Sequence, residues 1–146
     1  MLQLLRISNF ALINEVQINF NEGYTIITGE TGAGKSVLLG GLGLVLGKRV
    51  DFSHINDINK KCIIEAVFNI DKFNLKSFFE TNDIDFDAQT ILRREVLPSG
   101  KSRAFINDTP VNLNELQELS NFLIDIHSFL GPYYLHTPRN KFHVSL

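Results

Sequence analysis

The chain has 146 residues, of which 44% are hydrophobic, 21% charged and 10% aromatic, and this composition is typical of a folded domain with a hydrophobic core. The formal net charge of −2 excludes a strong overall attraction to nucleic acid, and the single cysteine, Cys62, excludes an internal disulfide framework. Cys62 is expected to be a small buried hydrophobe rather than a reactive thiol. The absence of a leader pattern and of a membrane-length apolar run predicts a cytoplasmic protein without membrane contact.

The first strands precede a glycine-rich motif. Residues 2–7 form a short apolar run, and residues 10–20 alternate between apolar and polar side chains, which is typical of a half-buried antiparallel strand. A turn over 21–23 follows. The apolar segment 24–28 is then expected to be a buried strand that leads directly into the motif. Two edge-type strands before such a motif indicate a mixed sheet rather than a simple doubly wound one.

The glycine-rich motif fits the G-x-x-x-x-G-K-[ST] phosphate loop at every fixed position. Its residues are Gly29, Glu30, Thr31, Gly32, Ala33, Gly34, Lys35 and Ser36. Glycines let the backbone turn tightly and aim its N–H groups at phosphate oxygens, the lysine reaches the outer phosphates, and the serine hydroxyl can hold Mg²⁺. Because a strand precedes the motif and an apolar run of helical length follows it, we predict that the chain binds a nucleoside triphosphate. The alternative is a glycine-rich turn that binds nothing.

The predicted helix after the loop contains three internal glycines, at positions 40, 41 and 43. Each glycine costs about 1 kcal/mol relative to alanine in a helix interior, so a neighbouring element is expected to pack closely against them. The alternative is a nucleotide or partner contact. Gly47 is predicted to end the helix as its C′ residue.

The second half of the chain alternates between predicted strands and helices. Asn112 and Glu115 have the spacing of a capping box at a helix start. The expected elements are a loop over 51–60, a strand over 61–70, a short helix over 74–81, a strand over 90–97 joined by a hairpin turn to a strand over 102–107, a helix over 113–120, a strand over 122–127 and a tail over 128–146 without a clear period.

Two further groups of residues are open to more than one interpretation. Four basic residues surround the predicted hairpin, and they form either a solvated face or a contact with the DNA backbone or a partner: Arg93, Arg94, Lys101 and Arg103. Asp125, at the end of the last predicted strand, is either a Mg²⁺-holding carboxylate of a compact phosphate-loop kinase or a strand-end residue. The four histidines have no spacing typical of a metal site.

Several blocks together resemble the RecN family of DNA repair proteins, relatives of the SMC and Rad50 ATPases. The blocks are residues 4–13 with Asn9-Phe10, residues 20–36 with the phosphate loop, residues 42–49, the pair Leu92-Arg93-Arg94 and 102–107, and residues 123–128. The resemblance implies an α/β fold of the P-loop NTPase class, namely the first lobe of an ABC-type ATPase head with a mixed sheet and an antiparallel β-subdomain. Residues 1–146 would be a single, incomplete N-terminal lobe of this head.

The resemblance also implies a function in recombinational repair of DNA double-strand breaks. In this family two heads sandwich ATP and Mg²⁺, so the implied partners are a second head, a C-terminal lobe, and DNA through the full-length protein. Ser36 would be a Mg²⁺ ligand, and Asp125 would lie on the strand that leads to the Q-loop rather than on the strand that carries the Mg²⁺-binding Asp. The family has a glutamine at the Q-loop, directly after His-Ser or His-Gly. In this chain Phe129 stands at that position, after His127-Ser128. An alternative is therefore a truncated, non-hydrolysing nucleotide-binding module that pairs with another head.

Overall fold

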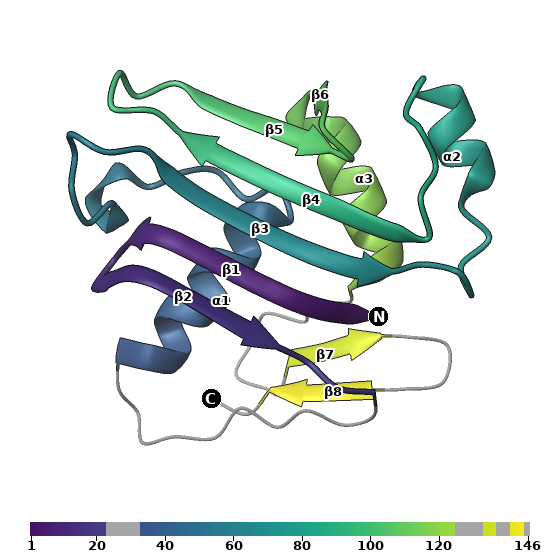
Figure 1. The fold of residues 1–146 in the computed structure, drawn as a ribbon, viewed down its shortest axis with the longest axis horizontal. Helices are drawn as coiled ribbons and strands as arrows, with labels where there is room; N and C mark the ends of the chain where they lie inside the picture. The colour runs from purple at the N-terminus through teal and green to yellow at the C-terminus, as the bar shows by residue number, and fades with distance from the viewer. Residues whose placement is uncertain (23–32, 125–132, 137–140, 145–146) are drawn as a thin grey trace.

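The fold is built on a six-stranded antiparallel sheet with strand order β2-β1-β3-β4-β5-β6 (Figure 1). The computed structural model describes residues 1–22, 33–124, 133–136 and 141–144. The strands of the sheet are β1 (Leu2–Phe10), β2 (Ile13–Asn19), β3 (Cys62–Asn69), β4 (Gln89–Val96), β5 (Ser102–Ile106) and β6 (Thr109–Val111). Central strands β3 and, after the exposed Gln89, β4 alternate between buried and half-buried side chains, because only one face of the sheet is covered by helices.

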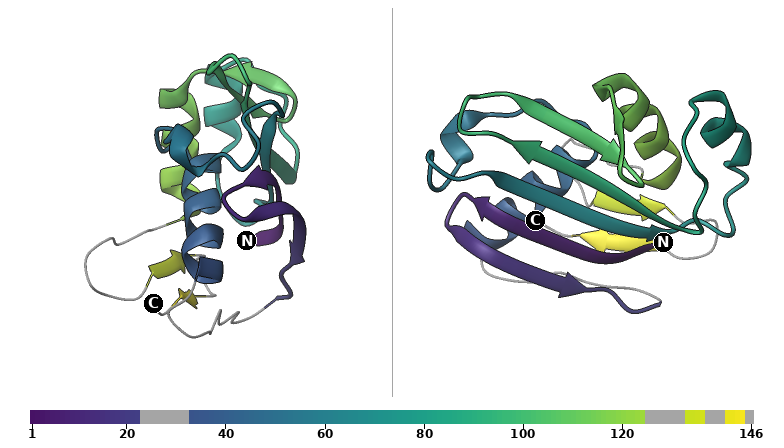
Figure 2. Two further views of the ribbon diagram at one scale, coloured as in Figure 1. Left: turned by 90° about the vertical axis from the view of Figure 1, so that its left-hand side faces the viewer. Right: turned by 45° about the horizontal axis from the view of Figure 1, so that its top comes forward.

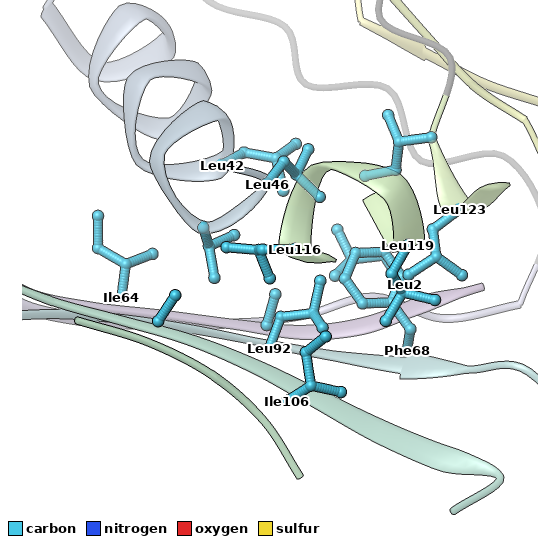
Figure 3. Packing of buried hydrophobic residues seen from close by; sticks show 14 of the residues in the cluster. Leu2, Leu42, Leu46, Ile64, Phe68, Leu92, Ile106, Leu116, Leu119 and Leu123 are labelled. Atoms are coloured by element: carbon cyan, nitrogen blue, oxygen red, sulfur yellow. The ribbon is translucent and has the colours of Figure 1, made fainter. Parts of the chain in front are cut away.

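Two helices cover the same face of the sheet, as the side view in Figure 2 shows. They are α1 (Ala33–Val45) and α3 (Leu113–Leu123). Leucines of both helices, among them Leu42 and Leu116, belong to one buried cluster with inward side chains of the sheet such as Ile64 and Leu92 (Figure 3). This apolar layer fixes the position of α1 on the sheet, and α1 is the helix that begins with the last residues of the predicted phosphate loop.

Shorter elements complete the described chain. They are the 3₁₀ turn η1 (Phe52–His54), the short helix α2 (Lys76–Thr81) and the antiparallel hairpin β7 (Tyr133–His136) and β8 (Lys141–Val144). The loop that carries η1 is tied to β1 by Asn9, whose side-chain amide donates to the carbonyl oxygens of Asp57 and Lys60 and whose side-chain oxygen accepts from the Asp57 N–H at 2.7 Å. Asn9 therefore has a structural task, which is to hold the loop at residues 57–60 against the end of β1.

The predicted strand over 122–127 is wrong at its start, because α3 continues through Phe122 to Leu123. The capping box of Asn112 and Glu115 is present as predicted and starts the helix, and Leu116, Leu119 and Leu123 keep one face buried for a further turn. Residues 125–127 lie outside the described residues.

Two other expectations need correction. The alternating segment 10–20 is not one strand, since Phe10 ends β1 and β2 begins only at Ile13 after a two-residue turn. The tail, for which no element was predicted, contains β7 and β8. The strand expected over 24–28, on which the mixed character of the sheet depends, lies outside the described residues. Among the described residues, no helix is long and apolar enough to cross a lipid bilayer.

Candidate nucleotide-binding site

The first turn of α1 contains the last four residues of the predicted phosphate loop, Ala33, Gly34, Lys35 and Ser36. The other four residues, at positions 29–32, lie outside the described residues. Gly34 and Ser36 are exposed and Lys35 is half-buried. Gly34 has no described atom within 4 Å of the position that a Cβ would occupy. The described half of the loop is thus on a helix N-terminus, as the motif requires.

The chemistry of this turn suits an anion. The first N–H groups of a helix have no partner within the helix, and the helix dipole places partial positive charge there. No acidic residue lies in the first turn of α1, so no neighbouring carboxylate in that turn competes with a phosphate. Lys35 contributes an ammonium group and Ser36 an exposed hydroxyl. A lone hydroxyl fits Mg²⁺, which normally keeps several waters and substrate oxygens among its ligands.

The glycines within α1 allow close packing against β1, which confirms the structural interpretation of Gly40 and Gly41. A Cβ on Gly41 would lie 2.8 Å from Cδ1 of Ile7, whereas a Cβ on Gly40 would lie 3.4 Å from the ring of Phe10. Ile7 is fully buried. At Gly41 the backbone of α1 therefore lies so close to β1 that a residue with a Cβ would force Ile7 to shift.

The C-terminal end of α1 is closed by a Schellman motif around Gly47, as predicted. Gly47 has φ +101°, its N–H donates to the Leu44 carbonyl at 3.1 Å, and the Lys48 N–H donates to the Gly43 carbonyl at 3.0 Å. Gln117 of α3 packs on Gly47 and donates from Nε2 to its carbonyl oxygen at 2.7 Å. Both helices on this face are thereby joined at the end of α1 that is farthest from the candidate site.

Arg94 is the largest departure from the predicted surface role of the basic hairpin. Only 2% of Arg94 is exposed, because it occupies an inward position of β4. Its Nη1 donates to the carbonyl oxygens of Leu44 and Lys48, both at 3.0 Å, and its Nη2 donates to Ser102 Oγ at 2.6 Å. Burial lowers the pKa of the Arg94 guanidinium from its usual value. A buried cation on the C-terminal carbonyls of α1 matches the negative end of the helix dipole.

The other three basic residues of the hairpin divide into two kinds. Arg93 is occupied, since its Nη1 donates to Asp108 at 2.8 Å and its guanidinium stacks over Phe105 at 4.4 Å. Lys101 and Arg103 are exposed, and their side chains form no ion pair or hydrogen bond among the described residues. The tight hairpin turn is formed by Pro98-Ser99-Gly100, in which the Gly100 N–H donates to the Leu97 carbonyl oxygen at 2.9 Å and Gly100 has φ +88°.

Among the remaining candidate residues, the predicted burial of Cys62 is confirmed. Cys62 is fully buried, and burial raises the pKa of its thiol to about 11, as expected for a buried, unreactive side chain. Asp125, His127 and Phe129 lie outside the described residues. Within the described ranges, no three His, Cys, Asp or Glu side chains are close enough to hold a metal ion together.

Comparison with known proteins assigns the class. The model of the AAA domain family matches residues 4–141, nearly the whole chain, and the chain therefore belongs to this ATPase family. A chain from a study of ATP-driven dimerization and DNA-stimulated activation of SMC ATPases superposes with a TM-score of 0.64 and 20% identity, covering 82% of this chain and 77% of that one. The fold is thus the first lobe of an ABC-type ATPase head, as predicted.

Within this class the chain resembles RecN, which confirms the family predicted from the sequence blocks. It is 41% identical over 128 residues to the DNA repair protein RecN of Vibrio cholerae, and 38% identical over 131 residues to that of Haemophilus influenzae. Each match covers 87% of this chain but only 23% or 24% of the relative. The chain therefore spans about a quarter of the length of these relatives.

Proposed function

We propose that this chain is the ATP-binding lobe of a RecN-like ATPase that acts in recombinational repair of DNA double-strand breaks in the cytoplasm. The observation that supports this most directly is the position of Lys35 and Ser36 in the first turn of α1, without an acidic residue in that turn. The similarity to DNA repair proteins named RecN extends over this segment, since it covers 87% of the chain.

In the proposed site, the backbone N–H groups of residues 29–36 would surround the phosphates and Lys35 would neutralise the outer ones. Ser36 would hold Mg²⁺, which neutralises phosphate charge when it is bound. The tight packing of Gly41 on Ile7 supports α1 against the sheet, so the first turn would be held in place before the nucleotide arrives. A second head and a C-terminal lobe would supply the groups needed for hydrolysis.

A second candidate follows from Phe129, which stands where the family glutamine is expected. A phenylalanine can neither hold Mg²⁺ nor orient a water molecule. The chain would then be a nucleotide-binding module that pairs with another head and does not hydrolyse ATP itself. Restoring glutamine with Phe129→Gln, in the presence of a complete RecN, separates the two candidates: a gain of ATP turnover supports the module, and no change supports the incomplete lobe.

The proposed site is tested by equilibrium binding of Mg²⁺-ATP to the 146-residue chain. Lys35→Ala is expected to weaken binding by about tenfold or more, which corresponds to about 1.4 kcal/mol. The matched control is Lys48→Ala, which removes the same charge just beyond the opposite end of α1 and is expected to leave affinity unchanged. Equal affinities for the native chain and Lys35→Ala would refute the site.

A further inference from the structure

The outer edge of β5 is only partly covered by β6, and a groove lies where this cover ends. β6 reaches along β5 only as far as Ala104, which pairs with Val111. In the same register the partner of Ser102 would be Leu113, but Leu113 is already the first residue of α3 and the chain has left the sheet. The groove at this vacant strand position has a volume of about 740 Å³.

The main-chain groups of Ser102 point into the vacant position. In an antiparallel ladder, successive residues of a strand direct their N–H and C=O groups alternately to the two neighbouring strands. Beside β5, the Leu97 N–H donates to the Lys101 carbonyl oxygen at 2.8 Å. At its other end, the Asn107 N–H donates to the Ile91 carbonyl oxygen at 2.9 Å. Odd-numbered residues of β5 therefore bond to β4, and Ser102 presents one donor and one acceptor that no described strand pairs.

The walls of the groove differ on the two faces of the sheet. On the side of the helices, the segment after α1 and the start of α3 line it with the apolar side chains of Val50, Phe52 and Leu113. Half of Phe52 is exposed. Arg103 lines the groove from the helix-free face, because it alternates with the buried Ala104 along β5. An added strand would thus meet an apolar wall on one face and a basic one on the other.

The charges around the groove favour an acidic segment. The charged side chains among its described lining residues are all arginines, namely Arg49, Arg94 and Arg103. The Arg103 side chain is exposed and forms no ion pair or hydrogen bond with a described residue. Glu95, which pairs with Arg103 across β4, is already 3.5 Å from Arg93 and 3.7 Å from Lys61. A carboxylate from another chain would therefore find the Arg103 guanidinium available.

The vacancy at Ser102 also decides between a peptide and a nucleic-acid backbone. A peptide residue in an added strand can accept from the Ser102 N–H and donate to its carbonyl oxygen. A phosphodiester backbone has acceptor oxygens only, so it would leave the Ser102 carbonyl oxygen without a donor. The groove fits a main chain that carries both kinds of group.

We propose that this groove binds an acidic, extended segment of a partner protein, which adds a short strand beside β5. The residue opposite Ser102 exchanges both main-chain hydrogen bonds with it and directs its side chain to the apolar wall at Val50 and Phe52. Its two neighbours point to the opposite face, where a carboxylate pairs with Arg103. The preferred sequence is thus acidic, apolar, acidic. This interaction goes beyond the proposed ATP site and does not depend on it.

The test is a nuclear magnetic resonance titration of the isotope-labelled 146-residue chain with the capped peptide Ser-Glu-Val-Glu-Ser. We expect saturable shifts of the amide signals of Ser102 and of residues 49–52, together with slower hydrogen exchange of the Ser102 amide. The same peptide with an N-methylated valine cannot donate to the Ser102 carbonyl oxygen and should bind at least about fivefold more weakly. The peptide Ser-Lys-Val-Lys-Ser, which reverses the charge, should not shift these signals.

The matched variants are Arg103→Glu, which should weaken binding about fivefold, and Lys72→Glu, which should leave it unchanged. Lys72 is exposed and precedes α2, at the end of the molecule opposite the turn between β4 and β5 (Figure 1). Native circular dichroism spectra for both variants show that the fold is kept. An unshifted Ser102 amide, equal affinities for the two variants, or full binding of the N-methylated peptide would each overturn the proposal. So would single-stranded DNA that displaces the peptide and shifts the same signals.

Discussion

The packing of α1 on the sheet predicts opposite effects for the same substitution at two adjacent glycines. Gly40 and Gly41 are both interior residues of α1, so replacing either by alanine gains about 1 kcal/mol of helix propensity. At Gly40 the new methyl group would lie 3.4 Å from the Phe10 ring, an ordinary contact. We therefore expect Gly40→Ala to raise the free energy of unfolding by about 0.5 to 1 kcal/mol.

At Gly41 the methyl group would lie 2.8 Å from Cδ1 of Ile7, and Ile7 is fully buried, so it would have to shift within the core. Overpacking of this kind costs about 1 to 3 kcal/mol, which exceeds the gain in propensity, so Gly41→Ala should lower the free energy of unfolding by about 1 kcal/mol. Ile7→Val removes the clashing Cδ1 atom. In a double-mutant cycle the pair Gly41→Ala and Ile7→Val should show a favourable coupling of about 1 kcal/mol.

The measurement is urea unfolding followed by far-ultraviolet circular dichroism, because the chain has no tryptophan. Gly40→Ala is the matched control, with the same chemical change on the same helix. If both alanine variants were equally stabilised, or if Ile7→Val showed no coupling with Gly41→Ala, the close approach of α1 to β1 would be wrong.

Two other predictions concern buried polar and titratable groups. Arg94→Met should lower the free energy of unfolding by about 3 kcal/mol, because it leaves two carbonyl oxygens at the end of α1 and the Ser102 hydroxyl without their donor. The control Lys101→Met, which is exposed beside the hairpin turn, should change this free energy by less than about 0.5 kcal/mol. Similar losses for both variants in urea unfolding would contradict the buried role of Arg94. Cys62 should react with a thiol reagent only as fast as the chain unfolds. Burial raises the pKa of the Cys62 thiol from 9.0 to about 11 in the folded chain, so the contribution of Cys62 to stability is complete below pH 9 and is lost as the pH rises towards 11. The difference in unfolding free energy between the native chain and Cys62→Ala should therefore fall between pH 9 and pH 11. A constant difference over this range would contradict the raised pKa.

Patterns within single elements predicted much of the fold. The alternation in the segments that form β3 and β4, the capping box at Asn112 and the stop at Gly47 are local signals, and each has its expected place in the structure. The phosphate loop stays a prediction from its motif. Its described half is on the N-terminus of α1, where the motif requires a helix to begin.

Features that depend on contacts between distant segments were not predicted. The burial of Arg94 had a signal in the sequence, because Arg94 is two residues from both Leu92 and Val96 and so lies on the same face of the strand as they do. Its charge, however, favoured a position on the surface. Its acceptors at the end of α1 are set by the tertiary fold alone.

We propose that this chain contains part of a composite ATP site, which binds the nucleotide but does not complete its hydrolysis. The most direct test incubates the 146-residue chain with radiolabelled Mg²⁺-ATP and measures bound nucleotide and released phosphate in the same sample, beside Lys35→Ala. We expect intact ATP on the native chain, loss of that ATP in Lys35→Ala, and negligible phosphate release from both. Steady phosphate release by the native chain that Lys35→Ala abolishes would contradict the claim.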